Sequence, residues 1–152
     1  MRASTALAID HADTRDAATN AARRRILSGN RHYPHGGVFT DLPDDTVWQW
    51  VSLRRDELLE VRFINWSYWL DVTAGTRRPV DAIPRIGHGL RVLVGEITAG
   101  RLPPPLILVG RPGEHDLVVL EGHNRLTGMV MAAAHLPADV TVLLGTATSM
   151  DK

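Results

Sequence analysis

The chain has 152 residues, of which 44% are hydrophobic and 22% charged, as is typical of one globular domain with a core of ordinary size. Its 17 basic residues balance 17 acidic ones, and the net charge of zero argues against a large basic surface for nucleic acid. The absence of cysteine excludes disulfides, thiolate metal sites and a cysteine nucleophile.

The N-terminal part, residues 1–45, is expected to be an extension made of a helix and a loop. Residues 10–28 have an alanine-rich helical composition, whereas residues 31–45 contain prolines and paired glycines that favour a loop. His32 and His35 lie in this loop at a spacing that would let two imidazoles share a metal ion. The proline between them and the lack of a third ligand nearby favour two solvated side chains instead.

Two features of the chain bear on its location. Asp10 follows the first apolar residues too soon for a signal peptide, and no run approaches the roughly 20 apolar residues of a membrane span. A cytoplasmic protein without a membrane partner is therefore expected.

A strand and then a helix are predicted after the extension. Residues 46–53 are rich in β-branched and aromatic side chains, which favour a strand. Residues 56–70 are predicted to form one helix, because apolar residues recur there at helical spacing, namely Leu59, Phe63, Trp66 and Leu70. Aromatic residues at such spacing are more often core than a base-stacking platform, so Trp66 and Trp69 are assigned to the core.

Residues 71–79 form a loop with two open interpretations. Arg77 and Arg78 follow Gly75 and Thr76, and the loop could hold an anion if it folds back toward Arg125. Alternatively, Gly75 ends a turn and both arginines face solvent. Nothing local decides between the two.

The next segments are predicted as a helix and two strands of a hairpin. Residues 84–100 have one apolar side and end on Gly100, which favours one amphipathic helix. A run of prolines then leads into an apolar strand at 106–109, and the turn at 111–116 joins it to a second strand at 117–121. Both strands are nearly continuous apolar runs, so burial on both faces is expected. A further strand is predicted at 140–144.

The most informative stretch is the junction that follows the second strand of this hairpin. The strand ends on a carboxylate, turns at a glycine and enters a helix, with the sequence Glu121-Gly122-His123-Asn124-Arg125. A helix start of this kind has unpaired backbone N–H groups and the positive end of the helix dipole, and both suit an anion. Arg125 would clamp a phosphate and Gly122 would allow close approach of the ligand.

A structural interpretation of the same five residues remains open. His123 or Asn124 would then only cap the helix, and Glu121 would pair with Arg125. The concentration of a carboxylate, an imidazole, an amide and a guanidinium in five residues favours a functional site, because a structural turn needs only one or two of them.

The junction and its flanks, residues 86–146, resemble the ParB/sulfiredoxin-like superfamily, in which a hairpin runs into a G-x-x-R or D-G-H-x-R turn, a helix and another strand. The resemblance implies an α+β domain at residues 46–148, with a small mixed sheet flanked by helices. Residues 149–152 are expected to form a loose tail. Sulfiredoxin chemistry is excluded, because the cysteine on which it depends is absent.

The resemblance also implies a nucleotide ligand. ParB-type domains bind and hydrolyse CTP, and related D-G-H-x-R proteins are nucleotide-dependent kinases of free serine. Glu121 and His123 would then be catalytic, and Glu121 would hold Mg²⁺. The phosphates of a nucleoside di- or triphosphate would contact Gly122, His123, Asn124, Arg125, Thr127, Arg77 and Arg78. The chain departs from the motifs of the superfamily at two positions. Glu121 stands in place of the aspartate of D-G-H-x-R, and Asn124 stands in place of the first of the two arginines usual in ParB.

Three functions are compatible with these expectations. The first is a nucleotide-dependent enzyme that transfers a phosphoryl group to a small-molecule acceptor or hydrolyses the nucleotide. The second is a noncatalytic nucleotide- or ligand-sensing module. The third, a DNA-associated role, is the weakest, because the chain is neutral and ends at Lys152 before a helix-turn-helix domain would fit.

Overall fold

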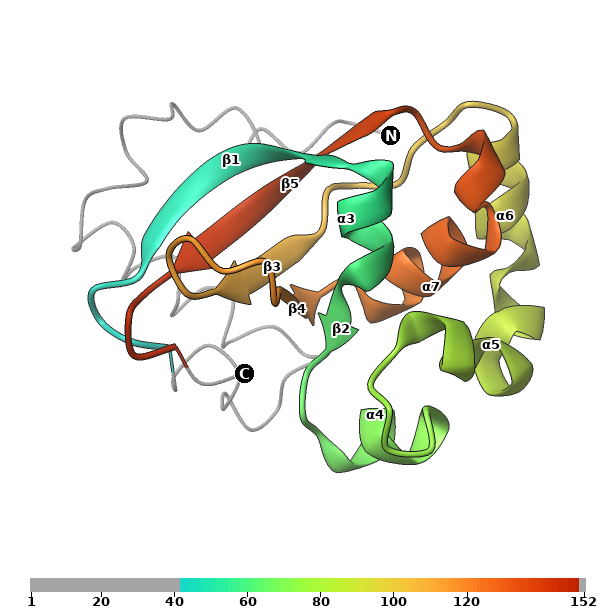
Figure 1. Cartoon of the computed structure of the whole chain (residues 1–152). Coiled ribbons are helices and arrows are strands. Elements are labelled where there is room, and N and C mark those ends of the chain that lie inside the picture. The colour runs from blue at the N-terminus through green and yellow to red at the C-terminus, as the bar shows by residue number, and fades with distance from the viewer. Residues whose placement is uncertain (1–41, 151–152) are drawn as a thin grey trace.

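A five-stranded mixed sheet is the framework of the computed structural model, which describes residues 42–150 (Figure 1). The strands lie in the order β1 (Val47–Arg54), β5 (Asp139–Thr146), β3 (Ile107–Gly110), β4 (Val118–Glu121) and β2 (Arg62–Phe63). β1 is antiparallel to β5, and β3 is antiparallel to β4. The pairs β5 with β3 and β4 with β2 are parallel. The predicted α+β class with a small mixed sheet is confirmed.

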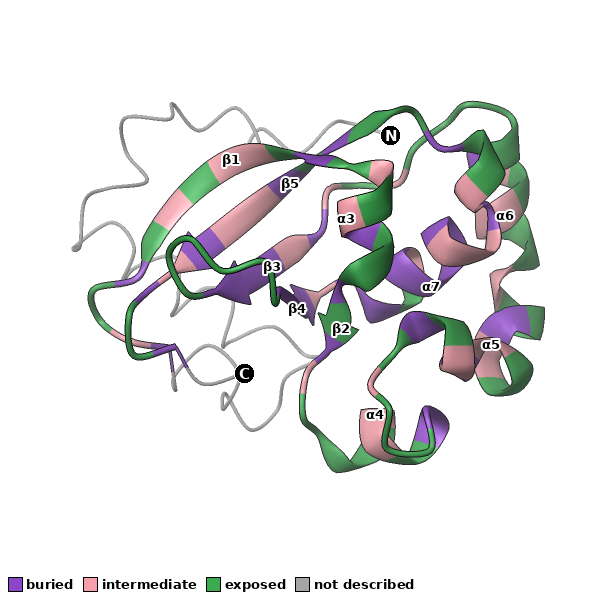
Figure 2. Ribbon diagram, in the orientation of Figure 1, coloured by how far each residue is buried: buried purple, intermediate pink, exposed green. Residues whose placement is uncertain are grey.

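Helices accompany this sheet in the described part of the chain. They are α3 (Arg55–Glu60), α4 (Ser67–Val72), α5 (Pro79–Ile86), α6 (Arg91–Thr98) and α7 (His123–Met131), with the short 3₁₀ turns η3 (Gly87–Leu90) and η4 (Ala133–His135). α7 packs against both α5 and α6. Figure 2 shows that buried residues concentrate in α7 and in β3 and β4. None of the helices described is long and apolar enough to cross a membrane.

Two apolar clusters lie against opposite faces of the sheet. Leu108 and Val119 belong to the larger cluster, whereas their neighbours Val109, Val118 and Leu120 belong to the smaller one. Successive side chains of a strand point to opposite faces, so β3 and β4 are buried on both sides, as predicted. The strands expected at 46–53, 106–109, 117–121 and 140–144 are all confirmed.

The single helix predicted at residues 56–70 is wrong. α3 ends at Glu60, and Arg62 and Phe63 pair with β4 as a parallel edge strand. Val61 and Phe63 are buried while Arg62 is exposed, a period of two that belongs to a strand. Pairing with a distant strand overrides the local helical spacing.

The predicted helix at residues 84–100 is interrupted. α5 already begins at Pro79, a favourable first helical residue, and a 3₁₀ turn from Gly87 separates it from α6. Gly87 is buried, and a Cβ there would lie 3.1 Å from Ile83 Cγ2 and 3.3 Å from Met131 Sδ. Gly87 therefore lies at a bend where α7 packs closely, and the helical periodicity of the sequence does not indicate this bend.

Other expectations concern the two ends of the chain. The helix at 10–28 and the histidines at 32 and 35 lie outside the described residues. The tail expected at 149–152 is corrected at Met150, which is 1% exposed and packs in the smaller cluster. Arg111 Nε donates a hydrogen bond to the Met150 carbonyl at 3.2 Å, which helps to fix this segment.

Candidate functional site

The strand-to-helix junction forms where the sequence predicts it. β4 ends at Glu121, Gly122 turns with φ +108° and ψ 25°, and α7 begins at His123. The first bond of the helix runs from the Leu126 N–H to the Gly122 carbonyl, at 2.7 Å. The N–H groups of His123, Asn124 and Arg125 precede that bond, so the helix itself supplies no acceptor for them.

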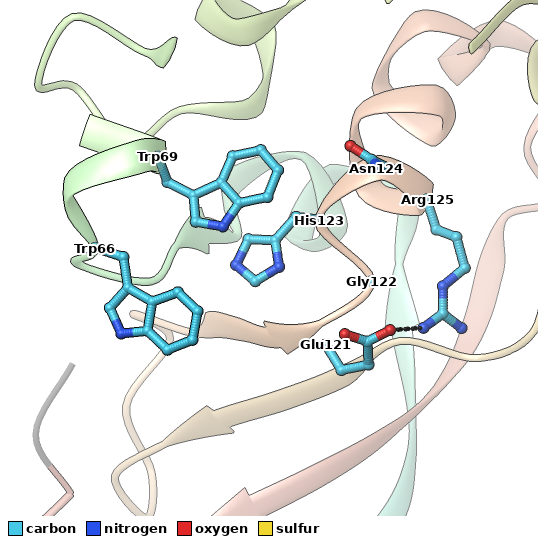
Figure 3. Close-up of a pocket in the computed structure, with 7 residues that line it drawn as sticks. All are labelled: Trp66, Trp69, Glu121, Gly122, His123, Asn124 and Arg125. Atoms are coloured by element: carbon cyan, nitrogen blue, oxygen red, sulfur yellow. Dashed lines mark hydrogen bonds and ion pairs between the residues drawn. The ribbon is translucent and has the colours of Figure 1, made fainter. Parts of the chain in front are cut away.

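A hollow of about 280 Å³ opens beside this junction (Figure 3). All five residues of the predicted motif line it, together with two tryptophans from the start of α4: Trp66, Trp69, Glu121, Gly122, His123, Asn124 and Arg125. Its size lies near the lower end of small-ligand sites, which span roughly 300–1,000 Å³. One wall is therefore a helix start with polar side chains, and the other is aromatic.

His123 is the most buried polar side chain of the hollow, with 7% exposure. Its ring is stacked on Trp69, with centroids 4.4 Å apart and planes 4° from parallel, and it meets the edge of Phe63 at 5.2 Å. Its Nε2 has no hydrogen-bond partner among the described residues. Figure 3 shows the imidazole in the lining of the hollow, directed between Trp66 and Glu121, and its Nε2 is buried.

The protonation of His123 follows from this setting. Burial, and to a smaller extent the positive charge of Arg125, lower the pKa of His123 to about 3. The imidazole is therefore neutral at physiological pH. It offers a ligand one donor and one acceptor nitrogen without a charge.

The Arg125 side chain forms hydrogen bonds that connect the start of α7 to neighbouring segments. Its Nη1 donates to the carbonyls of Pro104 and Pro105 at 3.0 and 2.8 Å, and its Nη2 donates to Glu121 Oε1 at 3.1 Å. The Glu121–Arg125 pair is the contact that the structural interpretation of the motif expects. These bonds engage three of the five N–H donors of the guanidinium.

Three other predicted ligand contacts lie outside the wall of the hollow. Thr127 is fully buried, and its hydroxyl donates to the His123 carbonyl at 3.0 Å. Arg77 Nε donates to the Phe63 carbonyl at 2.7 Å, and the Arg77 carbonyl accepts the Phe63 N–H. Arg78 is exposed. The loop at 71–79 thus braces the edge strand β2, and neither arginine joins the hollow.

A magnesium ion held by the protein alone does not fit these residues. Among residues 42–150 no group of three or more His, Asp or Glu side chains is placed to hold a metal ion. Glu121 is a single carboxylate that is already paired with Arg125. Mg²⁺ is usually held by carboxylates together with substrate phosphates, so any ion here would depend on the ligand.

The aromatic wall was missed by the sequence analysis. Trp66, assigned to the core, is 40% exposed and is the residue that precedes α4, whereas Trp69 packs against the larger cluster. The alternation of Val61, Arg62 and Phe63 is the signal that would have ended the first helix and placed Trp66 at the start of a second.

No family model, curated protein or solved structure matches this chain.

Proposed function

We propose that this protein binds a small phosphorylated ligand of the nucleotide class in the hollow at the β4–α7 junction and acts as a ligand-binding or sensing module. One observation carries the proposal: the unpartnered Nε2 of buried His123 and the start of α7 meet in the same hollow. A buried polar atom without a partner is unfavourable, and a ligand that supplies the partner removes that penalty.

The start of α7 supports a negative group on the ligand. The helix has nine residues, and its first amides and dipole favour an anion. Asn124 is exposed at this end and adds an amide donor. Gly122 contributes only backbone atoms to the lining of the hollow.

Binding is better supported than turnover by the groups present. His123 is a poor general base, because burial lowers its pKa to about 3. Glu121 is engaged by Arg125, and that arginine also holds the proline segment. Phosphoryl transfer would require these contacts to rearrange, whereas binding would not.

A charge placed at the helix start tests the proposal. Asn124→Asp is nearly isosteric and adds one negative charge beside the proposed phosphate. We expect it to weaken binding of ATP, CTP or pyrophosphate at least about fivefold, because like charges about 4 Å apart repel by roughly 1 kcal/mol or more. An acidic residue in the first turn favours the helix, so the fold should remain intact.

The matched control is Gln49→Glu, which adds the same charge at an exposed position of β1, a strand that β5 and β3 separate from β4. Titration calorimetry with the three ligands, with and without Mg²⁺, measures both variants, and a phosphate-release assay measures turnover. Equal affinities for the two variants, or no binding by the wild type, would contradict the proposal. Sustained phosphate release would show that the protein is an enzyme and not a noncatalytic sensing module.

A further inference from the structure

Trp66 and Trp69 stand one helical turn apart but have different surroundings. Trp69 is enclosed by other rings, with Phe63 at 4.6 Å, Tyr68 at 4.8 Å and His123 stacked at 4.4 Å. Trp66 is 40% exposed, and its indole lines the hollow. Figure 3 shows the two indoles on the same side of the hollow, with the imidazole of His123 beside both.

This arrangement fixes the position of the imidazole. The stack on Trp69 and the edge contact with Phe63 hold the ring of His123 in one orientation, and its Nε2 remains without a partner. Trp66 and His123 line the same hollow. A flat face and an in-plane hydrogen-bonding atom are together what a heterocyclic base requires, because a base has both a π-face and a polar edge.

We propose that Trp66 is the stacking platform for the base of the ligand and that His123 Nε2 hydrogen-bonds to the polar edge of that base. This inference rests on the proposed function, since it assumes that the phosphate of the same ligand lies at the start of α7. Within the nucleotide class that the proposed function names, the inference assigns the two residues that bind the base. The neutral imidazole pairs with a base through a donor or an acceptor without requiring a charge on it.

The test compares ATP, CTP and pyrophosphate on the full chain by titration calorimetry. Removing one aromatic stacking partner lowers affinity by about tenfold to a hundredfold. Trp66→Ala is expected to weaken ATP or CTP by that factor and to leave pyrophosphate unchanged. Trp66→Phe should restore most of the nucleotide affinity. Tyr68→Ala is the matched control, because Tyr68 is an exposed aromatic residue close in the chain that does not line the hollow.

The outcomes separate this inference from the proposed function. If wild-type protein binds pyrophosphate as tightly as both nucleotides, the base contributes nothing and the inference alone is wrong. The same conclusion follows if Trp66→Ala weakens pyrophosphate as much as the nucleotides, or if it weakens neither. If the wild type binds none of the three, both proposals are overturned.

Discussion

Replacing Gly122 with alanine is expected to lower the free energy of unfolding by about 2–4 kcal/mol. Gly122 has φ +108°, a region that L-residues avoid, and a Cβ there would lie 2.6 Å from Leu106 Cδ2. It would also lie 3.1 Å from Arg125 Nε. Leu106 is fully buried and Arg125 is held by its hydrogen bonds to Pro104 and Pro105, so neither side chain yields easily.

Urea unfolding of Gly122→Ala beside Gly89→Ala measures this effect. Gly89 is the matched control because a Cβ at that position meets no atom within 4 Å. Its replacement should change the free energy of unfolding by less than about 1 kcal/mol. If both variants unfold at the same urea concentration as the wild type, the turn does not require a glycine and the close contacts at the junction are not present.

Acidification is expected to destabilise the wild type relative to His123→Phe by about 2 kcal/mol between about pH 7.5 and about pH 5. The folded pKa of His123, about 3, lies below the ordinary value of 6.5. Below pH 6.5 the unfolded chain therefore takes up a proton that the folded chain does not. Stability is lost as the pH falls from 6.5 toward 3, at about 1.4 kcal/mol per pH unit.

Comparing how steeply the free energy of unfolding changes with pH in the wild type and in His123→Phe isolates the contribution of this histidine. Phenylalanine keeps an aromatic ring against Trp69 and has no titrating nitrogen, so the free energy of unfolding of His123→Phe should depend less on pH. His88→Asn, which removes an exposed histidine from η3, is the control and should keep the wild-type slope. A parallel pH dependence in the wild type and His123→Phe would show that the buried imidazole does not titrate as the structure implies.

The parts of the fold that were predicted correctly have local signals in the sequence. The strand at 46–53 follows from its β-branched and aromatic residues, and the hairpin of β3 and β4 from two apolar runs around a proline-glycine turn. The junction at Gly122 follows because a carboxylate, a glycine and polar residues separate an apolar strand from an amphipathic helix. Each of these signals lies within a few residues of the element that it specifies.

The parts that were missed depend on contacts between distant residues. β2 exists only because Arg62 and Phe63 pair with β4, more than 50 residues further along the chain. At the bend, a Cβ on Gly87 would lie 3.3 Å from Met131 of α7, a residue more than 40 positions away. Local periodicity carries no information about such contacts, and it therefore favoured two long helices.

The candidate site also has parts that the sequence predicted and parts that it did not. The five residues of the motif were predicted to gather at a helix start, and all five line one hollow. The hydrogen bonds from Arg125 to the carbonyls of Pro104 and Pro105 join residues 21 and 20 positions apart, and the sequence alone did not indicate them. The role of Trp66 was missed for the same reason as β2, because its position follows from where the first helix ends.

The most direct test of an anion site at the start of α7 is a titration of pyrophosphate into ¹⁵N-labelled protein, followed by NMR. Binding there predicts saturable shifts of the backbone amide signals of His123, Asn124 and Arg125. If these three signals stay in place while pyrophosphate is added, or if the shifts that occur belong to residues away from the hollow, the junction is a structural turn and binds no anion.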